Sequence, residues 1–470
     1  MRYVDRKRIL AAFALAIVAA STVGAETLET GGTASTGVVT GSTGTMSLQP
    51  VTGTTVTAPL QGVPKPGERL SLQQCVDIAL RRNPTIFAAD YTVNAADARV
   101  GQALSAYYPQ IDLLGGYSKY SISSNATSTL SGISQPRDLY QGSATLTQNI
   151  FDFGRTPSAV RIQRLNEDAA RSDRRNTVSQ VVYNVKQAYY NRLQAEKNLD
   201  VAIETVKLTR DQLDQAQGFY DAGIKSKYDV TSAEVNLSNA RLAQIRAENS
   251  VSVARVTLKN AMGDPEIPDF AIEDTLAFHK YPVTFDDAVQ RAYANRPDLQ
   301  SAVAKREASK ESVTFARTGY YPTLSGNANY TKAGDTTLLA REQNAWSAGV
   351  TLTIPLFSGF LTNYQVKEAK ENLNVQKANE ETLRQSILLD VQQAYLNMTA
   401  LEEGVAVAEL SVQQSQENYD IVNGRYGAGV GSPLDVTNAL VNLANAKTNY
   451  IFALATYKIA EAALLKAMGE

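Results

Sequence analysis

The sequence has little of what enzymes and metal proteins depend on. Among 470 residues it has one cysteine, Cys75, and one histidine, His279. Without a second cysteine the chain cannot form an internal disulfide, and a histidine with no cysteine nearby lacks the ligands of a zinc site. No glycine-rich phosphate loop or nucleophile elbow occurs either. We therefore expect no enzyme activity, no catalytic residue, no metal and no cofactor.

The chain also lacks a long apolar run and a strong excess of charge. Its apolar run at 9–20 is shorter than the roughly 20 residues that a membrane-spanning helix needs. This run follows Arg6, Lys7 and Arg8 and precedes small residues, so residues 1–25 are expected to be a secretory signal peptide. The net charge of −2 argues against nucleic acid as a partner.

Repetition is what the sequence has in abundance. Tyr108-Pro109 returns as Tyr321-Pro322, and Tyr220-x-x-Gly223 returns as Tyr426-x-x-Gly429. We therefore expect an internal two-fold repeat, with copies at 68–263 and 284–470. A proline-rich connector at 264–283 joins them, and a leader rich in Thr, Gly, Ser and Pro at 26–67 is expected to be flexible.

Each copy contains two segments in which apolar and polar residues alternate, at 111–121 and 143–151 and again at 324–331 and 347–357. Segments of about ten residues with small polar side chains on one face are typical of transmembrane β-strands around a wet lumen. An antiparallel sheet in a soluble domain shows the same alternation. Aromatic residues near the strand ends suit an interfacial belt: Tyr117, Tyr120, Tyr140, Tyr330 and Trp346.

Helical periodicity covers the rest of each copy. Residues 155–220 and 360–426 predict two helices, each about 100 Å long at 1.5 Å per residue. Asn83-Pro84 and Arg296-Pro297 break the helical segments that precede the strands. Each long helix is expected to turn back at Gly223 or Gly429. Ser226-x-x-Asp229 and Ser432-x-x-Asp435 then resemble capping boxes for the following helices.

Two strands in each copy make four in the chain, and four strands cannot close a barrel. Open sheet edges are not tolerated in lipid. If the strands cross a membrane, several chains must pool them, giving 8, 12 or 16 strands for a dimer, trimer or tetramer. The sequence alone does not choose among these numbers.

At this point the chain resembles the TolC-type outer-membrane channel family, over residues 70–469. The resemblance rests on the order of several motifs: Leu72-x-x-Cys75-x-x-x-Ala79-Leu80-x-x-Asn83-Pro84, Tyr-Tyr-Pro in both copies, Asn149-Ile150-Phe151-Asp152-Phe153-Gly154, Pro355-Leu356-Phe357-Ser358-Gly359 and the two tip signatures. It implies a membrane α/β fold. In it, a homotrimer forms a 12-stranded outer-membrane β-barrel, four strands per chain, continued by a long periplasmic α-helical barrel.

The resemblance also implies a function. Such a channel is a passive exit duct of a tripartite efflux pump or type I secretion system in the Gram-negative outer membrane, extending into the periplasm. Its implied partners are outer-membrane lipid, a periplasmic adaptor, and an inner-membrane transporter of the resistance-nodulation-division or ABC type. A structural coiled-coil envelope protein without a pore is the alternative, in which the strands are mere connectors.

A periplasmic gate can be carried over from the family only in part. Asp435 falls where the family places a constricting aspartate ring, Tyr426 where a tyrosine tethers the closed hairpins, and Asp229 where a partner acid lies. Asn438 and Gly431 occupy the positions of a second ring aspartate and a tethering arginine. Helix capping, worth about 1 kcal/mol, explains both aspartates without a gate.

The tips of the helical hairpins are the expected adaptor contacts. The residues concerned are Gly223, Ile224 and Lys225 in the first copy, and Gly429, Val430 and Gly431 in the second. An ordinary hairpin turn without a partner is the alternative interpretation.

Overall fold

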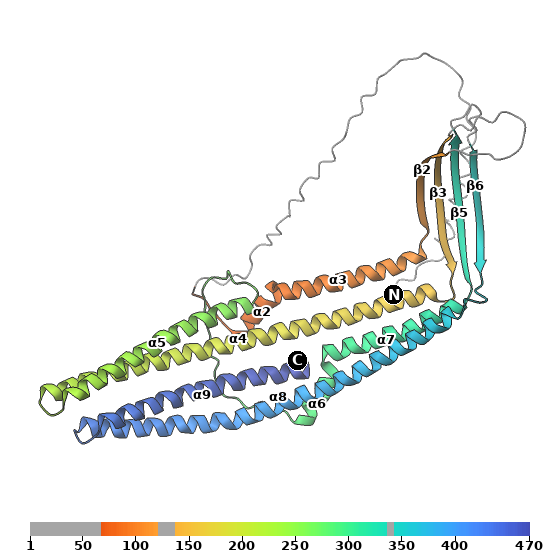
Figure 1. Cartoon of the computed structure of the whole chain (residues 1–470). Coiled ribbons are helices and arrows are strands. Elements are labelled where there is room, and N and C mark those ends of the chain that lie inside the picture. The colour runs from red at the N-terminus through yellow and green to blue at the C-terminus, as the bar shows by residue number, and fades with distance from the viewer. Residues whose placement is uncertain (1–66, 121–136, 336–342) are drawn as a thin grey trace, which may run out of the picture. The chain divides into compact units, whose positions relative to one another are not determined.

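The structure is a computed structural model that describes residues 67–120, 137–335 and 343–470 (Figure 1). The expected signal peptide, all but the last residue of the leader, and most of the polar segments between paired strands lie outside the described residues. Among the helices of the described residues, none is both long enough and apolar enough to cross a membrane.

The same kinds of element follow one another in each half of the chain. The first half has β1 (Arg69–Leu70), α2 (Leu72–Arg82), α3 (Pro84–Leu104), η1 (Ser105–Tyr107), β2 (Gln110–Tyr120), β3 (Arg137–Phe151), α4 (Arg155–Asp221) and α5 (Lys227–Ala261). The second half has β4 (Ala271–Ile272), α6 (Phe285–Asn295), α7 (Pro297–Arg317), η2 (Thr318–Tyr320), β5 (Thr323–Asp335), β6 (Gln343–Thr353), α8 (Leu361–Gly427) and α9 (Pro433–Met468).

Prolines open α3 and α7, as the sequence predicted. Pro84 and Pro297 occupy the first helical turn, where an amide hydrogen would have no partner within the helix. Asn83 caps α3, because its side-chain oxygen accepts a hydrogen bond from the Thr85 amide at 2.9 Å. The breaks therefore end one helix and start the next.

The strands β2, β3, β5 and β6 form one antiparallel sheet in that order. β3 and β5 are its central pair, so β2 and β6 are edge strands with one unpaired side in this chain (Figure 1). β3 starts at Arg137, earlier than the expected 143.

The expectation for the last strand was wrong at its end. β6 stops at Thr353, opposite Thr323, instead of continuing to 357. Pro355 has no amide hydrogen for a ladder, and the chain turns into α8 through Phe360, whose φ is +66°.

The helices pack side by side into two hairpins. α4 packs against α5, and α8 against α9, and α4 also contacts α3, α7 and α9 (Figure 1). We call α4–α5 the first hairpin and α8–α9 the second. Each hairpin has its own apolar core, centred on Tyr189 and Val185 in the first and on Tyr457 and Ile387 in the second.

A small parallel sheet holds the connector between the two halves. β1 pairs with β4, and the Tyr189 hydroxyl donates to the backbone oxygen of Glu273 at 2.8 Å. The buried Arg192 guanidinium donates to the Phe270 backbone oxygen at 2.7 Å and lies over the Phe270 ring. Sequence periodicity gave no sign of these two-residue strands.

Candidate channel wall and hairpin tips

Both hairpins turn through the same backbone motif. Gly223 and Gly429 have φ of +75° and +81°, and their amides donate to the oxygens of Tyr220 and Tyr426. The next amides, of Ile224 and Val430, donate one residue further back, which is the Schellman arrangement. We call residues 219–229 the first tip and 425–438 the second tip.

Tyr426 of the second tip packs against the first tip. Its side chain is only 2% exposed, and its ring meets the Phe219 ring edge-on at a centroid distance of 5.6 Å. The Lys225 ammonium lies 5.9 Å from the centre of the same ring, within the range of a cation–π contact. Burial, with the negative charge of Asp229 nearby, raises the pKa of the Tyr426 phenol above its ordinary 10.0.

Polar contacts join the hairpins further along. Asn236 of α5 donates its side-chain amide to the Thr437 hydroxyl of α9 at 3.1 Å. Lys447 of α9 donates to both carboxylate oxygens of Glu204 on α4, the shorter distance being 2.7 Å. The hairpins are therefore held together by the aromatic contact at the tip, by these polar contacts, and by apolar packing, in which Leu208 of α4 lies against the core of the second tip.

The two candidate gate aspartates differ. Asp229 accepts a hydrogen bond from the Ser226 amide at 3.3 Å, as its capping role requires. In the second tip the expected capping box is not formed, because the Ser432 hydroxyl accepts from the Leu434 amide instead. Asp435 is exposed beside Asn438, one turn along α9, and no hydrogen bond to its carboxylate occurs within the described chain.

Gly431 occupies a position that has no room for a side chain. A Cβ there would lie 2.7 Å from the backbone nitrogen of Tyr426 and 2.8 Å from its Cα. An arginine at this position would require the turn to move. The tethering arginine that the resemblance implies here would therefore not fit this turn, which the sequence did not reveal.

Apolar side chains project from the tips. Val430 is 74% exposed, and Ile224 and Leu434 are also largely exposed. Lys225, another expected adaptor contact, is half-buried because it lies over the Tyr426 ring. Of the six expected contact residues, four are exposed at the tip apices, whereas Lys225 and Gly431 are half-buried.

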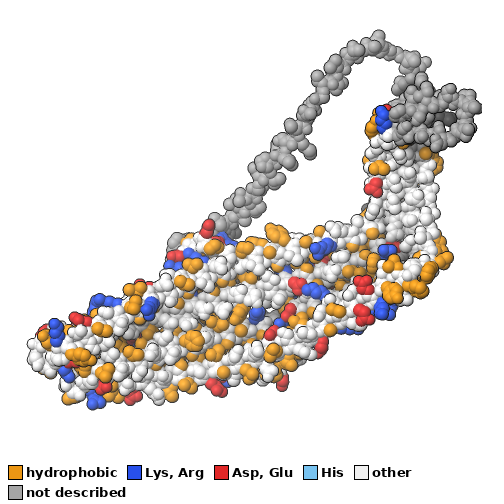
Figure 2. Space-filling model, viewed as in Figure 1, with side chains coloured by type: hydrophobic (Ala, Val, Ile, Leu, Met, Phe, Trp, Pro, Cys, Tyr) orange, Lys and Arg blue, Asp and Glu red, His pale blue; other side chains and the backbone are white. Residues whose placement is uncertain are grey.

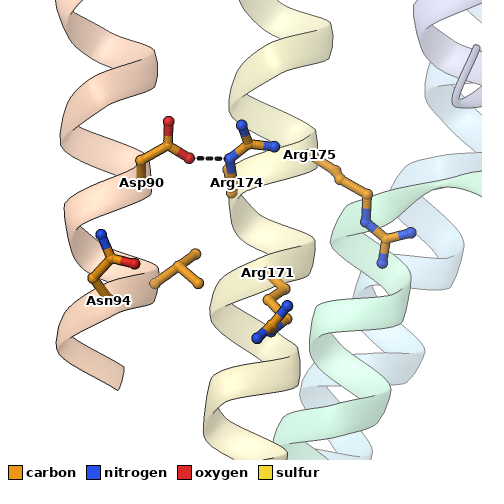
Figure 3. Close-up of a pocket in the computed structure, with 6 residues that line it drawn as sticks. Asp90, Asn94, Arg171, Arg174 and Arg175 are labelled. Atoms are coloured by element: carbon orange, nitrogen blue, oxygen red, sulfur yellow. Dashed lines mark hydrogen bonds and ion pairs between the residues drawn. The ribbon is translucent and has the colours of Figure 1, made fainter. Parts of the chain in front are cut away.

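A shallow cavity of about 450 Å³ lies between α3 and α4 (Figure 3). Three arginines line it, and each has a partner: Arg171 binds Glu167, Arg174 binds Asp90, and Arg175 donates to the Gln300 side-chain oxygen at 2.8 Å. Because these partners lie on α3, α4 and α7, the arginines stabilise the helical layer.

The sheet has one apolar and one polar face. Strand register places these residues on one side: Ile111, Leu113, Tyr117, Tyr140, Ala144, Leu146, Leu324, Ala328, Tyr330, Trp346, Ala348, Val350 and Leu352. The other side carries mainly Ser, Thr, Asn and Gln, with Leu114 and Leu139 as exceptions. On that side Thr145 donates to the Asn329 side-chain oxygen at 3.3 Å.

The model of one protein family, described as outer membrane efflux protein, matches residues 75–264 and 288–470. The chain belongs to the outer membrane efflux protein family. Membership places the protein in the Gram-negative outer membrane, reaching into the periplasm, as an exit duct for efflux or secretion.

Relatives within the outer membrane efflux protein family match along most of their length. Protein CyaE of Bordetella pertussis is 26% identical, covering 87% of this chain and 86% of its own. Outer membrane protein TolC of Escherichia coli is 24% identical, with 85% and 82% covered.

Solved structures of this kind share the fold. The Campylobacter jejuni CmeC outer membrane channel superposes with a TM-score of 0.71 at 20% identity, covering 85% of each chain. The expected family resemblance is thus confirmed, while the individual gate and adaptor residues stay predictions.

Proposed function

We propose that this chain is one subunit of a homotrimeric outer-membrane channel, which passively conducts substrates delivered by an inner-membrane transporter and a periplasmic adaptor. The observation that carries the proposal is the two-faced, open-edged sheet joined to helices about 100 Å long. An apolar outer face suits lipid, and a polar inner face suits a water-filled lumen.

The open edges of the sheet support oligomerisation. In lipid, the free backbone groups of β2 and β6 need partners, which a neighbouring copy supplies when its β6 pairs with β2. Three copies give 12 strands, the number that the family resemblance implies.

Exposed apolar stripes support the same arrangement in the helices. On α5 the residues are Tyr228, Val235, Leu242, Ile245, Val253 and Val256, and on α8 they include Tyr364, Val375, Leu389, Leu396, Val407, Leu410 and Ile421. Many of these residues are spaced by about seven or eleven positions along their helix. Such spacings correspond to two or three helical turns, so the residues lie along one face of the helix. Contact between α5 of one copy and α8 of the next would bury both stripes.

The junction between strands and helices suits the periplasmic membrane surface. Exposed aromatic rings gather there, among them Tyr108, Phe153, Tyr321, Phe357 and Phe360. Charged side chains are few over the visible face of the sheet and frequent over the helices (Figure 2). Aromatic rings favour the membrane–water interface, so outer-membrane lipid is the proposed surrounding of the strands.

The exposed tip apices support adaptor contact. Ile224 and Val430 offer apolar side chains beside glycine turns, without a partner for most of their surface. A photo-crosslinker at either position should capture a periplasmic adaptor, whereas one at the exposed Glu248 of α5 should not. Equal capture from all three positions would argue against tip docking.

Asp435 and Tyr426 support a gate at the periplasmic end. Three exposed Asp435 carboxylates near a common axis would attract cations, while Tyr426 keeps each second tip against the first. Asp435→Ala should reduce cation preference in single-channel recordings, and Glu417→Ala on exposed α8 surface should not. An unchanged preference in Asp435→Ala would remove the aspartate from the gate.

The domain boundaries belong to the same proposal. Residues 1–25 direct export and are removed, 26–67 form a leader, and the repeats at 68–263 and 284–470 flank a connector at 264–283. Recovery of heat-modifiable trimers in the outer-membrane fraction tests the whole assembly. Recovery of monomers from the soluble periplasm would favour the structural coiled-coil alternative.

A further inference from the structure

A tyrosine followed two residues later by a lysine occurs once in each strand pair. Tyr117-Ser118-Lys119 lies in β2, and Tyr330-Thr331-Lys332 lies in β5. The separation between the two motifs equals that between Tyr108 and Tyr321, which mark the same point in each repeat. The two motifs therefore occupy corresponding positions.

Both lysines lie on the apolar face of the sheet. Side chains alternate along a strand, so Lys119 shares a face with Tyr117, and Lys332 with Tyr330. Register extends these pairs across the sheet, where Tyr117 is opposite Tyr140 and Tyr330 is opposite Trp346. Besides aliphatic and aromatic residues, the end of this face carries polar ones, with Asp138 opposite Lys119 and Asn344 opposite Lys332.

The position of the two lysines along the strands explains why this face carries them. Lys119 and Lys332 stand at the ends of β2 and β5 that lead to segments 121–136 and 336–342, away from the helices. Each lysine lies about 7 Å beyond its tyrosine along the strand. If the tyrosines mark the outer membrane–water interface, the lysines reach the level of the lipid headgroups.

The contacts of the first motif leave the lysine accessible. The Tyr117 ring lies 5.1 Å from that of Tyr140, and the Tyr117 hydroxyl donates to the Asp138 carboxylate at 2.9 Å. The Lys119 ammonium lies 3.6 Å from the same carboxylate, but its side chain is 59% exposed. An exposed ion pair of this kind is weak, so a stronger anion can compete for the lysine.

We propose that Lys119 and Lys332 bind the phosphate groups of the phosphorylated glycolipid in the outer leaflet, with Tyr117 and Tyr330 packed at the level where its acyl chains begin. The inference rests on the proposed membrane-embedded trimer, which would present six such lysines around its circumference. Charge complementarity selects this occupant: an ammonium above an apolar band matches a phosphorylated headgroup above its acyl chains.

The test uses the full-length protein in detergent, with bisphosphorylated lipid A as the probe and native mass spectrometry as the readout. Wild type should bind this lipid more tightly than lipid A with the same acyl chains but no phosphate. The double variant Lys119→Gln/Lys332→Gln should bind bisphosphorylated lipid A about 30-fold more weakly, because the protein loses two lysines that face the anionic lipid headgroup. Lys207→Gln/Lys377→Gln, on exposed helical surface outside both tips, should bind as wild type does.

Three outcomes would overturn the inference. The double variant could bind the lipid as tightly as wild type, or wild type could bind the dephosphorylated lipid as tightly as the phosphorylated one. Displacement of the lipid by millimolar inorganic phosphate would be the third, because free phosphate would then be the occupant. Recording channels in planar bilayers separates this failure from that of the proposed function. If wild type forms normal channels but binds the lipid equally well with and without phosphate, only the inference fails. If wild type is monomeric and forms no channels, the proposed function fails.

Discussion

The Tyr426 ring at the end of α8 meets the Phe219 ring near the end of α4 edge-on, with centroids 5.6 Å apart and planes at 85°. These residues lie in different hairpins. Under the proposed gate, the contact has to break if the second tip swings away from the first.

Removing the Tyr426 ring should loosen the second tip. Truncating a buried aromatic side chain to alanine costs about 3–5 kcal/mol, so Tyr426→Ala should raise hydrogen exchange at 419–440 and increase single-channel conductance. Tyr220→Ala is the matched control, because Tyr220 occupies the corresponding position in the first tip yet is 42% exposed. Equal effects of both variants would show that the contact of Tyr426 with Phe219 stabilises the tip no more than the exposed Tyr220 ring does.

The same residue predicts sensitivity to high pH. The raised pKa of Tyr426 means that the folded state holds the phenol proton more tightly than the unfolded state. This contribution to the free energy of unfolding is complete below pH 10 and is lost as pH rises through the folded-state value. Melting temperatures at pH 9 to 12 should fall more steeply for wild type than for Tyr426→Phe, in which no phenol titrates. Melting temperatures that fall equally steeply in both proteins would show that the Tyr426 phenol makes no such contribution.

Gly431 should not tolerate a methyl group. Gly431→Ala places a Cβ against the Tyr426 backbone, and overpacking of this kind costs about 1–3 kcal/mol. Gly424→Ala adds the same methyl in open space within α8 and should be neutral or stabilise by up to about 1 kcal/mol. Thermal unfolding of the two variants provides the comparison, and a stable Gly431→Ala would mean that the turn relaxes easily.

A charge in the α5 stripe should weaken assembly. Leu242→Glu would bury an unpaired carboxylate between subunits, at a cost of about 3 kcal/mol or more per interface. Ala243→Glu, also exposed and rotated by about 100° around the helix, should leave the trimer intact. Light scattering of the detergent-solubilised variants gives the mass of each. A trimeric Leu242→Glu would place the contact elsewhere.

Sequence patterns predicted the main elements because those elements are long or repeated. Residues 155–220 carry enough helical periodicity to define α4 within one residue at its end. The alternation in 347–353 likewise predicted which side chains of β6 share a face. Asn83-Pro84 identified a helix start because proline has a specific place there.

The features that the sequence did not reveal depend on contacts between distant residues. Phe219 gave no signal as the partner of Tyr426, since a single amino-acid sequence carries no information about which aromatic rings meet. Gly431 resembled other turn glycines, and only the backbone geometry shows that a side chain would collide there. The β1–β4 pair is too short for any periodicity.

Electrical recording of purified full-length protein in planar lipid bilayers, combined with its mass in detergent, tests the central claim most directly. The account predicts particles of three chains that produce discrete, ohmic conductance steps, with larger steps from Tyr426→Ala. Monomeric particles that leave the bilayer without conductance would contradict it.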